Sequence, residues 1–231
     1  MCLNNWGGID HKVLEFHEYV NLFSGKSGSG KSTVMDAIQV ILYGSFSPSF
    51  LNKAADDAKN RRSVLSYLRG EQKDGSANRK DCDFCSVIAL EIEDTGTHII
   101  TCIGIAFEVR KSDSEIKKFV YFSHSGKMPE SEYLTEQGVC YSNQEIKKLI
   151  SARTKSDDNR GKGEVNRIYG SKEAYLGTLY DVILGYIDQN RFITMEKSAI
   201  ALKMTNGTGQ FIRDYMFPKN TSNTIATISE Q

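Results

Sequence analysis

The sequence predicts an α/β fold built around a phosphate-binding loop, and three adjacent stretches of the chain carry that prediction. Residues 25–33 read Gly-Lys-Ser-Gly-Ser-Gly-Lys-Ser-Thr and fit the phosphate-loop pattern G-x-x-x-x-G-K-[S/T] at every fixed position. Residues 19–23 before the loop, apolar except for Asn21, predict a short buried strand, and the periodic apolar residues after the loop predict a helix. Strand, loop and helix therefore follow one another in the order that the motif requires.

Each residue type in the loop has a task in binding a nucleoside triphosphate. Glycines let the backbone turn tightly and bring its N–H groups up to phosphate oxygens. Lys31 supplies a cation for the β- and γ-phosphates, and the Ser32 hydroxyl is placed to hold Mg²⁺. The positive end of the following helix adds to the anion site. The residues predicted to bind the nucleotide are Gly25, Ser27, Gly28, Ser29, Gly30, Lys31, Ser32 and Thr33.

The elements around the loop can be assigned in order. Short strands are expected before it, at residues 3–9, 12–16 and 19–23. Apolar residues after it recur at the spacing of one helical face, at positions 34, 37, 38, 41 and 42. A helix should therefore run from about Lys31 to Tyr43, and Gly44 suits the position just past its C-terminus.

The second half of the chain predicts an antiparallel meander and further helices. Alternating apolar residues separated by turns indicate strands at 86–94, 98–110 and 118–124. The acidic residues of the first of these strands alternate and lead into a turn, which favours a sheet edge over a Mg²⁺-binding acid. Helices are expected at 143–152, 172–184 and 192–202, the second capped by Ser171. The predicted architecture is a mixed sheet with an antiparallel meander and peripheral helices.

Composition excludes several classes of protein. The chain has 231 residues, 39% of them hydrophobic, which is enough for one substantial core. Its 29 basic and 29 acidic residues balance, so any surface for nucleic acid must be local. No apolar run approaches the roughly 20 residues of a membrane span, and the N-terminus lacks the blocks of a signal peptide. These features predict a soluble, cytoplasmic protein.

The five cysteines favour reduced thiols over a disulfide framework. Cys82 and Cys85 form a C-x-x-C, the spacing of a zinc-ligand pair, but a second such pair is missing from the sequence. We therefore expect small buried thiols where a strand begins, with a structural metal as the alternative.

A basic stretch follows the predicted helix. It contains Arg61, Arg62 and Arg69, which could approach the nucleotide or a nucleic-acid backbone. Five acidic residues are interleaved between Asp56 and Asp81, however, and a charged run is often only a solvated face. Both interpretations stay open at this point.

Several segments together resemble a known family. Asn4-Asn5-Trp6, residues 20–33 and residues 35–39 are similar to the N-terminal head half of SMC-type ATPases. Residues 50–55, Arg61-Arg62 and residues 67–71 resemble the MukB-like subunit (JetC) of Wadjet plasmid-defence systems, and residues 211–218 resemble the segment leading into the coiled coil of MukB relatives. Ser27 departs from the family, which usually has Asn there.

The resemblance implies a P-loop NTPase fold of the ABC/SMC-head type. Residues 1–217 would form the N-terminal lobe, and residues 218–231 would begin a coiled coil that is truncated here. The implied cofactors are ATP and Mg²⁺, with Gln210 or Gln189 as candidates for the Mg²⁺-sensing glutamine. The implied partners are the protein's own C-terminal head lobe, a second head, kleisin-like and accessory subunits, and DNA.

The resemblance also implies a division of the catalytic machinery. The signature loop and the water-activating acid belong to the C-terminal lobe, so we expect no catalytic residue and almost no ATPase activity in this chain alone. In the complete protein, ATP would join two heads and hydrolysis would separate them, driving DNA loop extrusion and plasmid restriction.

Two other classes of function remain open from the sequence. One is a self-contained phosphate-loop enzyme such as a kinase or GTPase-like switch, although Asn52-Lys53-Ala54-Ala55 lacks the Asp of a guanine-selecting motif. The other is a non-catalytic module in which the loop holds a structural phosphate. Measurable turnover would favour the first class, and Mg²⁺-independent binding would favour the second.

Overall fold

The computed structural model describes residues 1–26, 28–47, 63–72, 75–156 and 165–200. The chain divides into two units, Met1–Asp188 and Gln189–Gln231. The described part of the second unit is helix α5 (Gln189–Ile200), which confirms the helix expected at 192–202 and starts it three residues earlier. The boundary predicted between residues 217 and 218 lies outside the described residues, as does Gln210.

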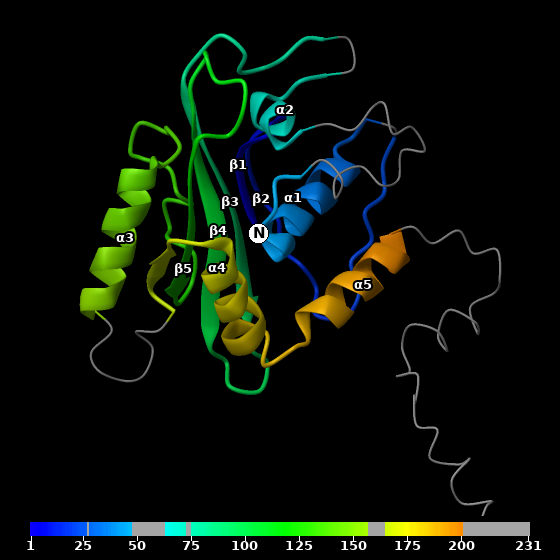
Figure 1. Cartoon of the computed structure of the whole chain (residues 1–231), viewed down its shortest axis with the longest axis vertical. Helices are drawn as coiled ribbons and strands as arrows, with labels where there is room; N and C mark the ends of the chain where they lie inside the picture. The colour runs from blue at the N-terminus through cyan, green and yellow to red at the C-terminus, as the bar shows by residue number, and fades with distance from the viewer. Residues whose placement is uncertain (27, 48–62, 73–74, 157–164, 201–231) are drawn as a thin grey trace, which may run out of the picture. The chain divides into compact units, whose positions relative to one another are not determined.

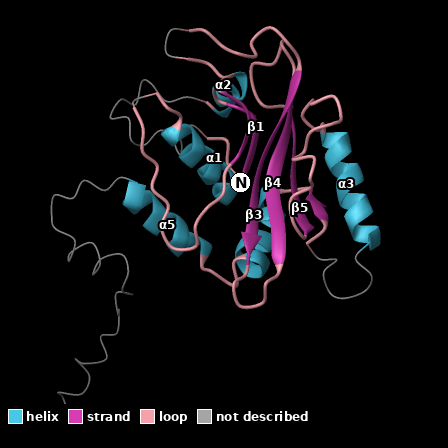
Figure 2. Ribbon diagram, turned by 180° about the vertical axis from the view of Figure 1, so that it is seen from behind, coloured by secondary structure: helices cyan, strands magenta, loops and turns pink. Residues whose placement is uncertain are grey.

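The first unit is built on a six-stranded sheet (Figures 1 and 2). Its strand order is β2-β1-β3-β4-β5-β6, and every described pairing is antiparallel. The prediction of a mixed sheet is therefore wrong for the described residues. The strands are β1 (Cys2–Trp6), β2 (Ile9–Val13), β3 (Phe84–Glu93), β4 (Ile100–Val109), β5 (Lys118–Ser125) and β6 (Arg167–Tyr169).

The meander β3-β4-β5 is confirmed. Its first turn is closed by the Asp94 side chain, whose Oδ1 accepts hydrogen bonds from the backbone N–H groups of Gly96 and Thr97. β1 pairs with β3 only at Val87–Ala89, so among the described strands the acidic end of β3 is paired with β4 alone. β3 lies between β1 and β4 in the described sheet, so the prediction of a sheet edge is wrong for this strand, although its acidic end is paired on one side alone.

Helices cover both faces of the sheet, and Figure 1 shows α3 and α1 on opposite sides of it. On one face Ala89, Phe122 and their neighbours pack with Ile146 and Ile150 of α3. The opposite face carries Tyr121, whose hydroxyl donates to the carbonyl just past α1. The helices are α1 (Lys31–Tyr43), α2 (Val64–Arg69), α3 (Asn143–Ser156), α4 (Lys172–Gly177) and the π-helix η3 (Thr178–Ile183).

Most predicted helices are confirmed. α1 has the predicted bounds, with Gly44 in the left-handed conformation at its C-terminus (φ 52°). Ser171 caps α4 by accepting a hydrogen bond from the Ala174 N–H at 3.2 Å. The helix expected to run on to residue 184 instead changes to π geometry at Thr178.

The strand predicted at residues 19–23 is wrong. These residues form no strand, and the side chains of Tyr19, Val20 and Leu22 are 79%, 77% and 90% exposed. A strand needs a neighbouring strand for its backbone hydrogen bonds. The described sheet does not pair with this segment, so apolar composition alone was misleading here.

Candidate nucleotide-binding site

The phosphate loop leads directly into α1. Gly30 occupies the N-cap position with φ 87°, a left-handed conformation that favours glycine. Within the described residues no side chain caps this helix end, and Lys31, Ser32 and Thr33 fill its first turn without an acidic residue. The first N–H groups of a helix have no partner inside the helix. This helix end can therefore donate several hydrogen bonds to an anion, aided by the helix dipole.

Lys31 lies over the loop that precedes it. Its ammonium group donates to the carbonyl oxygens of Gly25 and Lys26, at 2.7 and 3.0 Å, and to the Ser29 hydroxyl at 3.3 Å. The loop is also closed by a backbone hydrogen bond from Ser29 N–H to the Lys26 carbonyl. The structure thus brings the lysine and the loop backbone together. A phosphate bound here would replace these neutral carbonyl acceptors of the ammonium with negatively charged oxygens.

The predicted loop residues lie at the surface, where a ligand can reach them. Gly25, Gly28, Ser29 and Ser32 are exposed, and Gly30, Lys31 and Thr33 are partly exposed. Ser27 lies outside the described residues.

A magnesium ion would need the nucleotide to complete its ligands. The Ser32 hydroxyl is exposed and suits a hard cation, because Mg²⁺ prefers oxygen ligands. In the part of the chain that the structure describes, no group of three or more His, Cys, Asp or Glu residues could hold a metal by itself. The residues therefore fit a Mg²⁺ ion that arrives with phosphate oxygens.

A buried support for the loop was missed by the sequence analysis. The indole N–H of Trp6 donates to the carbonyl of Thr33 at 2.8 Å, and the ring stacks on Tyr67 of α2 with centroids 5.1 Å apart. The Tyr67 hydroxyl donates to the buried carboxylate of Asp36 on α1. β1 and α2 therefore position the first turns of α1 through buried hydrogen bonds.

The turn after β1 completes this support. The Gly7 N–H donates to the Tyr67 carbonyl at 2.8 Å, and Arg79 donates to the carbonyl oxygens of Gly7 and Leu68. Arg79 is 6% exposed and also pairs with Asp10 at 2.7 Å. Burial lowers the pKa of this guanidinium, and the Asp10 carboxylate opposes the shift. The adjacent Trp6-Gly7-Gly8 was the sequence signal that could have suggested a close approach of the backbone here.

Of the three arginines predicted to contact the nucleotide or a nucleic acid, the structure describes one. Arg61 and Arg62 lie outside the described residues. Arg69 ends α2, and one of its terminal nitrogens donates to the carbonyl oxygens of Lys111 and Asp113 at 3.1 and 2.5 Å. This gives Arg69 a structural role, and its contact with a nucleotide or nucleic acid stays a prediction.

The C-x-x-C pair is not part of any site that the structure describes. Cys82 is exposed and Cys85 is partly buried, so the expectation of buried thiols is wrong for Cys82. Both are free thiols, as are the other three cysteines. Burial raises the pKa of the Cys85 thiol to about 11, which keeps it protonated near neutral pH.

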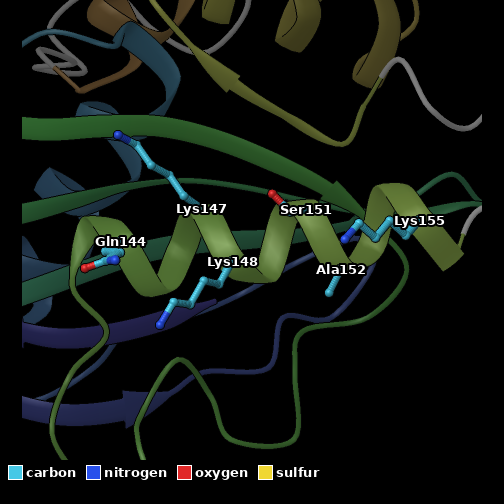
Figure 3. Close-up of a pocket in the computed structure, with 6 residues that line it drawn as sticks. All are labelled: Gln144, Lys147, Lys148, Ser151, Ala152 and Lys155. Carbon is cyan, nitrogen blue, oxygen red and sulfur yellow. The ribbon is translucent and has the colours of Figure 1, made fainter.

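A separate hollow of about 410 Å³ lies along α3 (Figure 3). It is lined only by residues of that helix: Gln144, Lys147, Lys148, Ser151, Ala152 and Lys155. α3 covers the sheet face opposite α1, so this hollow is distinct from the phosphate loop.

Comparison with known families bears on the loop directly. The family model described as the P-loop containing region of AAA domain matches residues 1–58. The match supports a P-loop NTPase. It spans β1, β2, the loop and α1, and it suggests nucleotide binding, with which Mg²⁺ typically comes. No curated protein matches the chain. In the described residues no helix has the length and apolarity to cross a membrane.

Proposed function

We propose that this chain is the ATP·Mg²⁺-binding half of an ATPase head whose catalytic groups lie elsewhere. One observation carries the proposal: the N-terminus of α1, which no described side chain caps, and the Lys31 ammonium converge on the same exposed loop. Backbone N–H groups of Gly30 to Thr33 would hold phosphate oxygens, and Lys31 would neutralise the β- and γ-phosphates. Mg²⁺, bound with the nucleotide and the Ser32 hydroxyl, would supply further charge neutralisation.

Two features support a half-site. Hydrolysis needs a group beside the γ-phosphate, such as a carboxylate, that positions the attacking water. The acid nearest in sequence on α1, Asp36, is buried and accepts a hydrogen bond from Tyr67. The segment before the loop also exposes the apolar side chains of Tyr19, Val20 and Leu22, a surface that another lobe of the protein would cover.

The finer proposal follows the family resemblance. A C-terminal lobe and a second head, SMC-like and MukB-like, would complete the site and close on ATP. Kleisin-like and accessory subunits would couple this cycle to DNA loop extrusion and plasmid restriction, as in Wadjet systems.

The proposal is tested by nucleotide binding to matched lysine variants. Lys31→Ala should weaken Mg·ATP binding by about 2 kcal/mol, or about 30-fold, because charged hydrogen bonds to phosphate are lost. Lys26→Ala removes the same charge from the same loop and should change affinity by less than about threefold, since surface charges contribute little. Titration calorimetry measures both.

Two results would contradict the proposal. Equal affinities of the Lys31→Ala variant and the unaltered chain for Mg·ATP would show that this loop is not the nucleotide-binding site. Robust ATP turnover by the chain alone would refute the half-site and favour a self-contained enzyme.

A further inference from the structure

We propose that Trp6 is a positioning residue for the nucleotide site, holding the first turn of α1 so that its N–H groups face the phosphates. This inference rests on the proposed function of the loop. Trp6 is fully buried and lies on β1, outside the loop motif.

The indole is fixed from two sides. Its N–H donates to the Thr33 carbonyl at 2.8 Å, and its ring lies nearly parallel to that of Tyr67, at 8°. Tyr67 in turn donates its hydroxyl to Asp36, one turn further along α1. The stacked pair therefore grips α1 at residues 33 and 36, which lie on the same side of a helix.

Trp6 reaches α1 because the backbone of β1 changes direction at Asn5. Strand alternation would place Trp6 on the same sheet face as Cys2, which packs with α3. Asn5 has φ 55°, a left-handed conformation that asparagine tolerates better than most residues. Its side-chain amide is anchored on the Cys85 carbonyl at 2.7 Å. The following side chain is thus directed to α1, on the opposite face.

Gly7 allows the turn between β1 and β2 to approach α1 closely. A Cβ at Gly7 would lie 2.5 Å from the Thr33 Cγ2, so only glycine fits without displacing that residue. The Thr33 carbonyl is thereby bonded to the Trp6 indole, and the Thr33 methyl group fills the space that a side chain at residue 7 would need. Since Thr33 ends the loop motif, any shift of its peptide would move the neighbouring N–H donors.

The arrangement predicts a spectroscopic signal. Trp6 is the only tryptophan of the chain, so all tryptophan emission reports on this contact. Phosphates bound to the first turn of α1 would polarise the Thr33 carbonyl to which the indole N–H is bonded. Mg·ATP should therefore shift the emission, and in Lys31→Ala the same shift should need about 30-fold more Mg·ATP.

The test compares Trp6→Phe with Tyr175→Phe. Trp6→Phe keeps an aromatic ring against Tyr67 but removes the N–H donor. Tyr175→Phe removes a donor from the other end of the same helix, where the Tyr175 hydroxyl bonds the Ile41 carbonyl at 3.0 Å. Mg·ATP affinity is measured by calorimetry well below each melting temperature. We expect about fivefold weaker binding for Trp6→Phe, as for one lost hydrogen bond, and less than about twofold for Tyr175→Phe.

The outcomes separate the two proposals. If the unaltered chain fails to bind Mg·ATP, the proposed function and this inference both fall. If it binds and Trp6→Phe binds equally well, only the positioning role is overturned. Should Trp6→Phe not fold, the emission of the unaltered chain decides: a shift on binding supports the role, and an unchanged spectrum at saturation refutes it.

Discussion

Lowering the pH should destabilise the fold through one buried histidine, His124 on β5. It is fully buried, its Nδ1–H donates to the Ser125 carbonyl at 3.0 Å, and its Nε2 accepts from the Tyr133 hydroxyl at 2.9 Å. Both bonds suit the neutral ring. Burial, assisted by the charge of Arg153 and opposed by the Ser125 hydrogen bond and by Glu91, lowers the pKa of His124 to about 4.

The size of the effect follows from the two pKa values. The unfolded chain should protonate His124 near pH 6.5, whereas the folded chain resists protonation down to about pH 4. Between these values the unfolded state binds more protons, so stability is complete above pH 6.5 and is lost as pH falls. The loss should reach about 2 kcal/mol near pH 5 and about 3 kcal/mol near pH 4.

The assay is urea unfolding across this pH range with two matched variants. His124→Gln removes the titrating ring from the core, and His98→Gln removes one that is 79% exposed beside Glu93. Carboxylates titrate in every variant, so the informative quantity is the difference in pH slope. The slope should flatten in His124→Gln by more than it changes in His98→Gln, which controls for the loss of an imidazole at the surface. Parallel slopes for His124→Gln and the unaltered chain would show that the buried ring is not the cause.

Two further predictions concern the support beneath the loop. Gly7→Ala should lower stability by about 2 kcal/mol, because the added methyl group meets Thr33 and φ is 59°, whereas Gly8→Ala, with open space around it, should have little effect in thermal unfolding. Arg79→Lys should lower the free energy of unfolding in urea by about 2 kcal/mol, because one ammonium group cannot reach the separate carbonyl and carboxylate partners of the guanidinium. An unchanged melting temperature for Gly7→Ala, or an unchanged urea midpoint for Arg79→Lys, would mean that these contacts do not stabilise the turn.

Local sequence patterns predicted the elements that depend on local interactions. α1 could be bounded at both ends because its apolar spacing, its loop glycines and Gly44 all act within one segment. The meander was predictable for the same reason, since each of its turns joins neighbouring strands. The three-residue strand β6 was missed because it is too short to show alternation.

Long-range contacts explain the errors. Residues 19–23 have a strand-like composition, but composition cannot supply the neighbouring strand that would pair with them. The role of Trp6 depends on the left-handed backbone at Asn5, which reverses the alternation that sequence analysis assumes. The residue of α2 on which Trp6 stacks, Tyr67, lies some sixty residues away in the chain.

The two ends of the phosphate loop therefore differ in how firmly the rest of the fold fixes them. On the α1 side, Thr33 is fixed by Trp6 and Gly7, and both are buried. On the upstream side, Val20 and Leu22 are exposed and lie outside the sheet. Binding of phosphate depends mainly on the N-terminus of α1 and on Lys31. The contacts of Trp6 and Gly7 with Thr33 position both. Positioning of water for hydrolysis depends on a further group beside the γ-phosphate, and the acid on α1, Asp36, is buried and accepts a hydrogen bond from Tyr67 instead. This difference is the structural reason to expect measurable nucleotide affinity and almost no turnover from the same chain.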